Sequence, residues 1–257
     1  MRINNNIIAI NSHRQYGINN GNLGKNMEKL SSGFRVNRAA DDAAGLAISE
    51  KMRAQIRGLN MASKNSQDAV SLVQTAEGGM QTIQDILQRM RELAVQARSD
   101  TNHVDVDRDA LQLEIAQLVQ EIDDITITTQ FNKMQLLDAS ASPGTDANGK
   151  AIGSWIIQAG ANQGQTMTIS IRDVSAFGLG LIGSAGADPL GDPGTTGMIR
   201  VDATNSADAG LRANDALARV DSAINSVSMQ RAQLGAYQNR LEYKIQNLNN
   251  QAENVAA

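Results

Sequence analysis

The feature that most constrains this chain is an apolar pattern between Ile48 and Ala97 that alternates steps of four and three residues. Only Gln55 and Ser66 interrupt the series, whose members are Ile48, Met52, Gln55, Leu59, Ala62, Ser66, Ala69, Val73, Ala76, Met80, Ile83, Leu87, Met90, Ala94 and Ala97. This spacing is that of the buried seam of a long helix in a bundle or coiled coil. Four more apolar residues widen the face: Ile56, Val70, Ile86 and Leu93. We therefore expect more than one helix to pack against it.

Three glycines, Gly58, Gly78 and Gly79, fall inside this series. Each costs ~1 kcal/mol relative to alanine in a helix interior. Because the apolar series keeps its register across them, we predict one continuous helix, with a bend at the Gly78–Gly79 pair as the alternative.

Three other stretches carry helical spacing. After a turn at 99–103, a second helix is predicted on Val104, Leu111, Ile115, Leu118, Ile122 and Ile125, and the short connection favours an antiparallel neighbour. The C-terminal third repeats the three–four alternation on Leu217, Val220, Ile224, Val227, Arg231, Leu234, Gln238, Leu241, Ile245 and Leu248. A shorter N-terminal stripe holds Ile3, Ile7, Ile10, Leu23, Met27, Leu30 and Phe34.

The middle of the chain has a different period. A dense apolar run at Trp155, a Gly/Asn-rich turn, and the alternation of Met167, Ile169 and Ile171 with polar residues predict a β-hairpin. The stretch Ala185–Gly197 contains two of the three prolines and reads as an exposed loop. The predicted fold class is therefore mainly α: a long coiled-coil-like antiparallel helical rod with a small β-hairpin subdomain.

Composition excludes several classes of protein. Twenty-three Lys+Arg against 27 Asp+Glu give a net charge of −4, which argues against a nucleic-acid partner. No apolar run approaches the ~20 residues of a membrane span, and Ile7–Ile10 is too short for the core of a secretory signal peptide. The chain is expected to be soluble, or to leave the cell by a route that needs no cleaved peptide. The absence of cysteine excludes disulfides and a cysteine nucleophile.

Asp41 and Asp42 are the most suggestive paired carboxylates, since Gly45 follows and Arg35 precedes them. Such a pair could take part in a metal or acid–base site. We favour a structural interpretation, in which the two acids open the long helix as N-cap and dipole partner.

Two motifs resemble ligand sites without the context that those sites need. Gly178–Gly183 matches G-x-G-x-x-G but leads into a Gly/Pro-rich stretch rather than a helix. Asp105–Asp109 imitates the start of a calcium loop, yet Ala110 and Ala116 stand where glycine and an acid are required. We predict no catalytic, cofactor-binding or metal site, and hence no enzyme.

The segment Gln88–Gln96 has the densest polar face of the long helix. Arg89, Arg91 and Glu92 lie beside the seam. They fit a solvated surface and a protein interface equally well. Leu93 adds an apolar residue to this mixed surface, and apolar anchors among arginines are typical of protein interfaces.

Several long segments together resemble bacterial flagellin. They are MRINNNIIAIN, LSSGFRVNRAADDAAGLAISEKMRAQIRGLN, NSQDAVSLVQTAEGGM, LQRMRELAVQA, EIDDITITTQFN, WIIQAGANQGQTM and QLGAYQNRLEYKIQNLNN, in family order over almost the whole chain. The resemblance implies a subunit of the extracellular flagellar filament that serves swimming motility. It also implies export through the flagellar type III apparatus and contact with the filament cap. The outer domains of the family would be reduced here to about residues 183–197.

The resemblance also implies a role for each part of the chain. Residues 1–32 would form the inner-core helix, with Ile3, Ile7, Ile10, Leu23, Met27 and Leu30 serving assembly. Residues 33–45 would be the spoke linker, with Arg35, Asn37, Asp41, Asp42 and Gly45 at the helix start. Residues 46–136 and 204–257 would form the rod, and 137–203 the small β region. Subunit packing and recognition by Toll-like receptor 5 would use Gln88, Arg89, Arg91, Glu92, Leu93, Gln96 and Glu114.

One departure concerns the end of the chain. Family members continue beyond the segment matching NNQAENVAA with a helical tail that pairs with the N-terminal helix, so this chain is expected to lack that tail. Residues 1 to about 32 should then be helical only with neighbours. The alternatives are a hook–filament junction protein, a truncated soluble receptor ligand that cannot polymerise, and a secreted enzyme on a flagellin-like frame. The last would need a catalytic insertion that the sequence does not contain.

Overall fold

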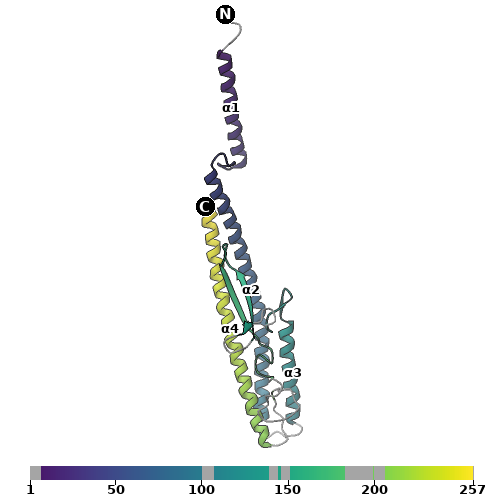
Figure 1. Ribbon diagram of the computed structural model, residues 1–257. Helices are drawn as coiled ribbons and strands as arrows, with labels where there is room; N and C mark the ends of the chain where they lie inside the picture. The colour runs from purple at the N-terminus through teal and green to yellow at the C-terminus, as the bar shows by residue number, and fades with distance from the viewer. Residues whose placement is uncertain are drawn as a thin grey trace. The chain divides into compact units, whose positions relative to one another are not determined.

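The computed structural model describes residues 7–99, 107–138, 144–145, 151–182, 199 and 206–256 (Figure 1). Ile3, Val104 and the predicted loop Ala185–Gly197 lie outside these residues. The helices are α1 (Ile7–Ser32), α2 (Ala43–Arg98), α3 (Asp107–Thr128) and α4 (Ser206–Ala256). The strands are β1 (Gln130–Phe131), β2 (Met134–Gln135), β3 (Gly144–Thr145), β4 (Ala151–Gln158) and β5 (Thr166–Arg172). No helix of the described part is long and apolar enough to cross a membrane.

The chain divides into two compact units, one of Gly58–Gln251 and one of Met1–Arg57 with Ala252–Ala257. The core belongs to the first unit. Every member of the predicted α2 series from Leu59 to Ala97 is buried there. The polar Ser66 is tolerated in the core because its hydroxyl donates to the carbonyl of Ala62 at 2.8 Å. Ile48 and Met52, the first members of the series, belong to the other unit and are 56% and 46% exposed.

Polar contacts show how α2 and α4 lie together. Ser63 forms a hydrogen bond with Asn249. Glu77 forms an ion pair with Arg231, and Arg91 forms one with Asp221. Residue numbers rise along α2 as they fall along α4, so these two helices run in opposite directions. Their shared core draws on the predicted C-terminal stripe, with Val220, Val227, Leu234 and Leu241 buried.

The helix α3 closes a second side of α2. Leu111, Ile115 and Ile122 are buried, as their spacing predicts, and Leu118 and Ile125 pack partly buried against the same core. In the half of the unit that holds α3, Figure 1 shows α2 between α3 and α4. The wide apolar face of α2 is thereby covered from two directions.

The predicted hairpin is present. Strands β4 and β5 pair antiparallel with Trp155 opposite Ile169, and β3 adds a short third strand at Ile152. Along β5 the buried residues alternate, with Met167, Ile169 and Ile171 facing the core. Strands β1 and β2 form a separate antiparallel pair after α3.

The glycine pair in α2 does not interrupt the helix, which is continuous from Ala43 to Arg98. A Cβ at Gly79 would lie 2.7 Å from the Thr129 hydroxyl oxygen and 2.9 Å from a Leu137 methyl. Glycine is therefore required at position 79 because the chain after α3 packs directly on the α2 backbone.

The other unit contains α1, and no residue of this helix is buried. Its large apolar side chains stand in solvent: Ile7, Ile8, Ile10, Tyr16, Ile18, Leu23, Met27 and Leu30 are between 50% and 79% exposed. The sequence pattern placed Phe34 in the same stripe, but it follows the end of the helix. The centre of its ring lies 4.6 Å from the guanidinium carbon of Arg53.

We predict fast amide hydrogen exchange along α1 in a monomeric sample. Burial contributes most of the stability of protein helices, and an isolated helix is marginal in water. Exchange measured by mass spectrometry should show low protection over residues 7–32 and high protection over residues 59–97. Comparable protection in the two segments would contradict the prediction.

The linker after α1 and the outer face of α2

The linker starts where α1 is capped. The N–H of Gly33 donates to the carbonyl of Lys29 at 3.0 Å, and Gly33 has φ of 73°. This left-handed conformation at the residue after a helix is a common C-terminal cap, and it favours glycine. The hydroxyl of Ser32 donates to the Lys29 carbonyl as well, at 3.2 Å.

At the other end of the linker, Asp42 caps α2. Its carboxylate accepts the N–H of Gly45 at 2.9 Å, and its carbonyl accepts the N–H of Leu46 at 3.0 Å. This is the geometry of an N-cap residue bonded to the third residue of the helix. A Cβ at position 45 would collide with the Asp42 carboxylate, so Gly45 lets the cap close. The structure thus places Asp42 at the N-cap position of α2.

Asp41 does not share that role. Its carboxylate accepts the backbone N–H groups of Asn37 and Arg38, each at 3.4 Å, and lies 4.0 Å from the Lys29 ammonium. Of the two acids, only Asp42 makes the N-cap bond, whereas Asp41 bonds back into the linker. The reason is geometric, because one N-cap carboxylate already satisfies the free N–H of Gly45.

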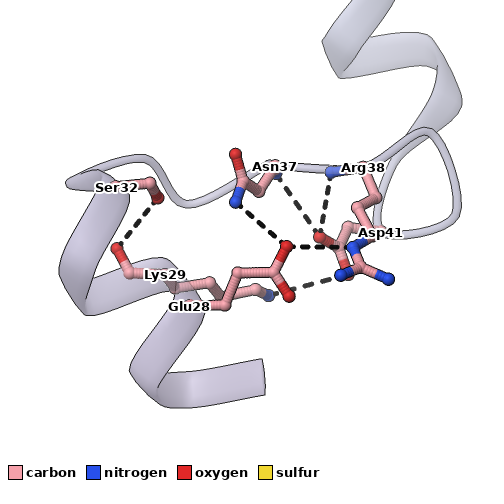
Figure 2. Close-up of polar contacts among 6 residues, drawn as sticks. All are labelled: Glu28, Lys29, Ser32, Asn37, Arg38 and Asp41. Atoms are coloured by element: carbon pink, nitrogen blue, oxygen red, sulfur yellow. Dashed lines mark hydrogen bonds and ion pairs between the residues drawn. The ribbon is translucent and has the colours of Figure 1, made fainter. Parts of the chain in front are cut away.

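Glu28, Lys29, Asn37, Arg38 and Asp41 together form what we call the linker clamp (Figure 2). One carboxylate oxygen of Glu28 accepts the Arg38 guanidinium at 2.9 Å and the Asn37 side-chain amide at 3.2 Å. Figure 2 shows these side chains converging between the last turn of α1 and the linker. The clamp fixes the path of the chain as it leaves α1.

Electrostatics in the clamp favour the charged forms. The pKa of Asp41 is lowered, first by the Asn37 N–H and then by the Arg38 N–H and the Lys29 charge. The pKa of Arg38 is raised by the hydrogen bond and charge of Glu28. Since a lowered carboxyl pKa stabilises the folded form above its unfolded value, the Asp41 contribution is present above about pH 4. It is lost as the pH falls through the lower folded pKa.

Sequence reasoning placed Asn37 and Asp41 at this linker but missed Glu28 as their partner. Glu28 lies nine and ten residues before Asn37 and Arg38. No periodicity connects residues across a turn of that length. Arg35, which was also predicted here, is exposed and is not part of the clamp.

The outer face of α2 is the second candidate region. Gln88, Arg89, Arg91, Glu92 and Gln96 are all exposed in the single chain. The structure brings Arg89 and Glu114 together, with two guanidinium nitrogens 2.8 and 3.0 Å from one carboxylate oxygen. Glu92 lies 3.2 Å from the same guanidinium, and these two acids raise the pKa of Arg89. Arg89 thus bridges α2 to α3.

Arg91 makes the equivalent contact on the other side of the helix. Its guanidinium lies 2.7 Å from the Asp221 carboxylate of α4. Sequence reasoning did not find Asp221, because the two residues are 130 positions apart.

Leu93 is not an exposed anchor. It is 1% exposed and belongs to the core that joins α2, α3 and α4. The sequence-based interpretation of Leu93 as part of an open mixed surface is wrong, because α3 covers the side of α2 on which it lies. Any effect of Leu93 on a partner would act through the packing of this core.

Among the residues that the structure describes, no group of three or more acidic or histidine side chains is placed to hold a metal ion.

Comparison with known proteins gives a consistent result. Residues 3–142 match the bacterial flagellin N-terminal helical region, and residues 217–257 match the bacterial flagellin C-terminal helical region. A flagellin of Bacillus subtilis is 49% identical over all of this chain and 85% of its own length. A flagellin of Halalkalibacterium halodurans is 46% identical over all of this chain and 83% of its own length.

Solved structures agree with these matches. The crystal structure of Bacillus cereus flagellin has a TM-score of 0.54 and 31% identity, over 72% of this chain and 88% of its own. A Vibrio parahaemolyticus structure that carries the name of a flagellar hook-associated protein has a TM-score of 0.60 at 11% identity, over 85% of this chain and 97% of its own. At that identity the second likeness concerns the fold alone.

We predict that Leu93→Ala lowers the free energy of unfolding by about 2–5 kcal/mol, because it opens a cavity in a closed core. The control is Val95→Ala on the same helix, where Val95 is 50% exposed; it should change stability by less than about 0.5 kcal/mol. Urea denaturation followed by circular dichroism measures both. Equal, small effects would show that Leu93 is not buried as described.

Proposed function

The chain belongs to the bacterial flagellin family, and we propose that it is a structural subunit of the flagellar filament that joins to further copies of itself through its terminal and rod helices. The observation that carries the proposal is the apolar face of α1, on which Leu23, Met27 and Leu30 are 58% or more exposed. Large apolar side chains standing together in solvent mark an interaction surface. Burial of this face by neighbouring copies would supply the stability that α1 lacks alone.

Within the subunit, we infer a coiled-coil-like rod. The alternating series of α2, the opposed direction of α4 and the buried side of α3 support this packing. The function needs no catalysis, since its mechanism is the burial of helical seams within and between copies.

The place of action follows from the family. We propose that the chain acts outside the cell in the filament, after passage through the flagellar export apparatus and addition beneath the cap. Curated relatives of Treponema maltophilum and Treponema phagedenis, each 42% identical, carry the name of flagellar filament core proteins.

Electron microscopy of the purified chain tests the assembly proposal. We expect filaments of uniform width. Replacing Leu23, Met27 and Leu30 together by serine should abolish them without changing the fold of residues 58–251, because these side chains are exposed in the single chain. Serine at Asn19, Asn22 and Asn26, exposed polar residues of the same helix, is the matched control. Normal filaments from the first variant would contradict the proposed role of α1.

We also propose that Toll-like receptor 5 recognises the outer face of α2, with Arg89 and Glu114 as contacts. The pair is half-exposed, charged and held in place across two helices, which suits recognition by a complementary surface. Leu93 would support this surface from below.

A receptor-driven reporter assay tests that role. Arg89→Ala should raise the concentration needed for a half-maximal signal by about tenfold or more, as expected for an interface arginine at a hot spot. Lys64→Ala, which removes an exposed cation elsewhere on α2, should leave the signal unchanged. Equal responses from both variants and the parent would remove Arg89 from the receptor contact.

A further inference from the structure

A groove between α4 and the end of the β4–β5 hairpin has an unusual combination of side chains. Its floor is apolar and buried, with Ala159 2% and Met167 9% exposed. Its rim is formed by Arg240, Tyr243 and Lys244 of α4. Arginine, tyrosine and methionine are the residues that protein interfaces favour. We call this feature the basic groove.

The cations of the basic groove have no acid to meet within the described part of the chain. Arg89, Arg91 and Arg231 of the same unit each lie against a carboxylate, whereas neither Arg240 nor Lys244 forms an ion pair there. The ring of Tyr243 is 73% exposed beside them. The groove therefore presents two charges and an aromatic ring to whatever covers it.

The outer face of α3 has the complementary chemistry. This helix contains six acids, and its only base, Arg108, is buried. Glu121 and Asp124 are exposed, and no ion pair engages either of them in the described residues. Apolar side chains accompany them, since Leu113 is 68% and Ile127 50% exposed.

The spacing of the two charge pairs also matches. Arg240 and Lys244 are four residues apart on α4, and Glu121 and Asp124 are three apart on α3. Each pair therefore spans one helical turn, about 5–6 Å. A single approach of one helix to the other brings both opposite charges together.

The two surfaces cannot meet within one copy. Arg231 meets Glu77 and Asn249 meets Ser63, so the groove's cations lie beside the stretch 63–77 of α2. Glu114 meets Arg89, and Thr129 lies against Gly79, so α3 lies beside the stretch 79–89. Figure 1 shows α3 on the side of α2 away from α4 at that level. The surfaces thus sit at different levels and on different sides of one unit.

We propose that the basic groove of one copy receives the acidic outer face of α3 of a second copy. Such a contact joins two different patches of the same chain, and contacts of this type generate open helical arrays when they do not close into a ring. The proposal rests on the proposed function and deepens it, because it names the two surfaces that meet between neighbouring subunits.

A cross-linking experiment tests the contact directly, because the chain has no cysteine of its own. Lys244→Cys protein is mixed with Glu121→Cys protein that carries a mass-shifting tag, and the mixture is oxidised at assembling concentration. A disulfide-linked heterodimer is expected. Asp85→Cys, which replaces an exposed acid on α2, is the matched control partner for Lys244→Cys and should give at least about fivefold less heterodimer.

Charge exchange gives an independent measurement. Reversing Arg240 and Lys244 to glutamate, or Glu121 and Asp124 to lysine, should raise the critical concentration for assembly by roughly tenfold. A chain carrying all four substitutions should return to near the parent value, because every groove then meets a reversed α3. Circular dichroism confirms that each variant keeps its helices.

The outcomes separate this contact from the filament function. If the chain forms filaments but Glu121→Cys gives no more heterodimer than Asp85→Cys, the contact is overturned and the function is kept. The expected heterodimer from a chain that forms no filaments would support the contact and overturn the function. Four substitutions that fail to restore assembly in a folded chain would also overturn the contact.

Discussion

The burial of one stripe along α2, from Leu59 to Ala97, is the interaction on which the rest of the unit Gly58–Gln251 depends. Covering it from one side would leave half of a wide apolar face in water. The helix α4 covers one side of the stripe, and the other side is covered by α3 near Arg89 and by the β4–β5 hairpin near Asn65. The alternation of four and three keeps the seam in register over the whole distance. The same packing brings Arg89 against Glu114 and Thr129 against Gly79.

Among the described residues, the stripe of α1 and the basic groove are two of the surfaces that the single chain leaves uncovered, and the same physics applies to both. The stripe of α1 has the spacing of a seam but no buried residue. The basic groove has an apolar floor, and neither of its two cations forms an ion pair with a residue that the structure describes. The core of the rod is formed by apolar seams between helices. Assembly would bury these two surfaces against other copies in the same way, so it extends the packing that folds the rod.

Sequence reasoning succeeded where a local rule applied and failed where distant segments meet. The spacing of α2 predicted its buried residues, and the two acids at the start of the long helix predicted that a carboxylate caps it. Leu93 was interpreted both as widening the buried face of α2 and as part of an open mixed surface, and only the tertiary structure, in which it is 1% exposed, decided between the two. The sequence did not distinguish Asp41 from Asp42, whose carboxylates bond in opposite directions, backward into the linker and forward into the helix.

The sequence by itself determined the helices, the hairpin, the absence of disulfides and the resemblance to flagellin, because periodicity and motifs are properties of neighbouring residues. Only the tertiary structure decided which charges meet. Arg91 with Asp221, Arg89 with Glu114 and Arg38 with Glu28 are joined across helices or across a turn. It also decided which charges stay open, as at Arg240 and Lys244, since an ion pair depends on the distance between two side chains and not on their separation along the chain.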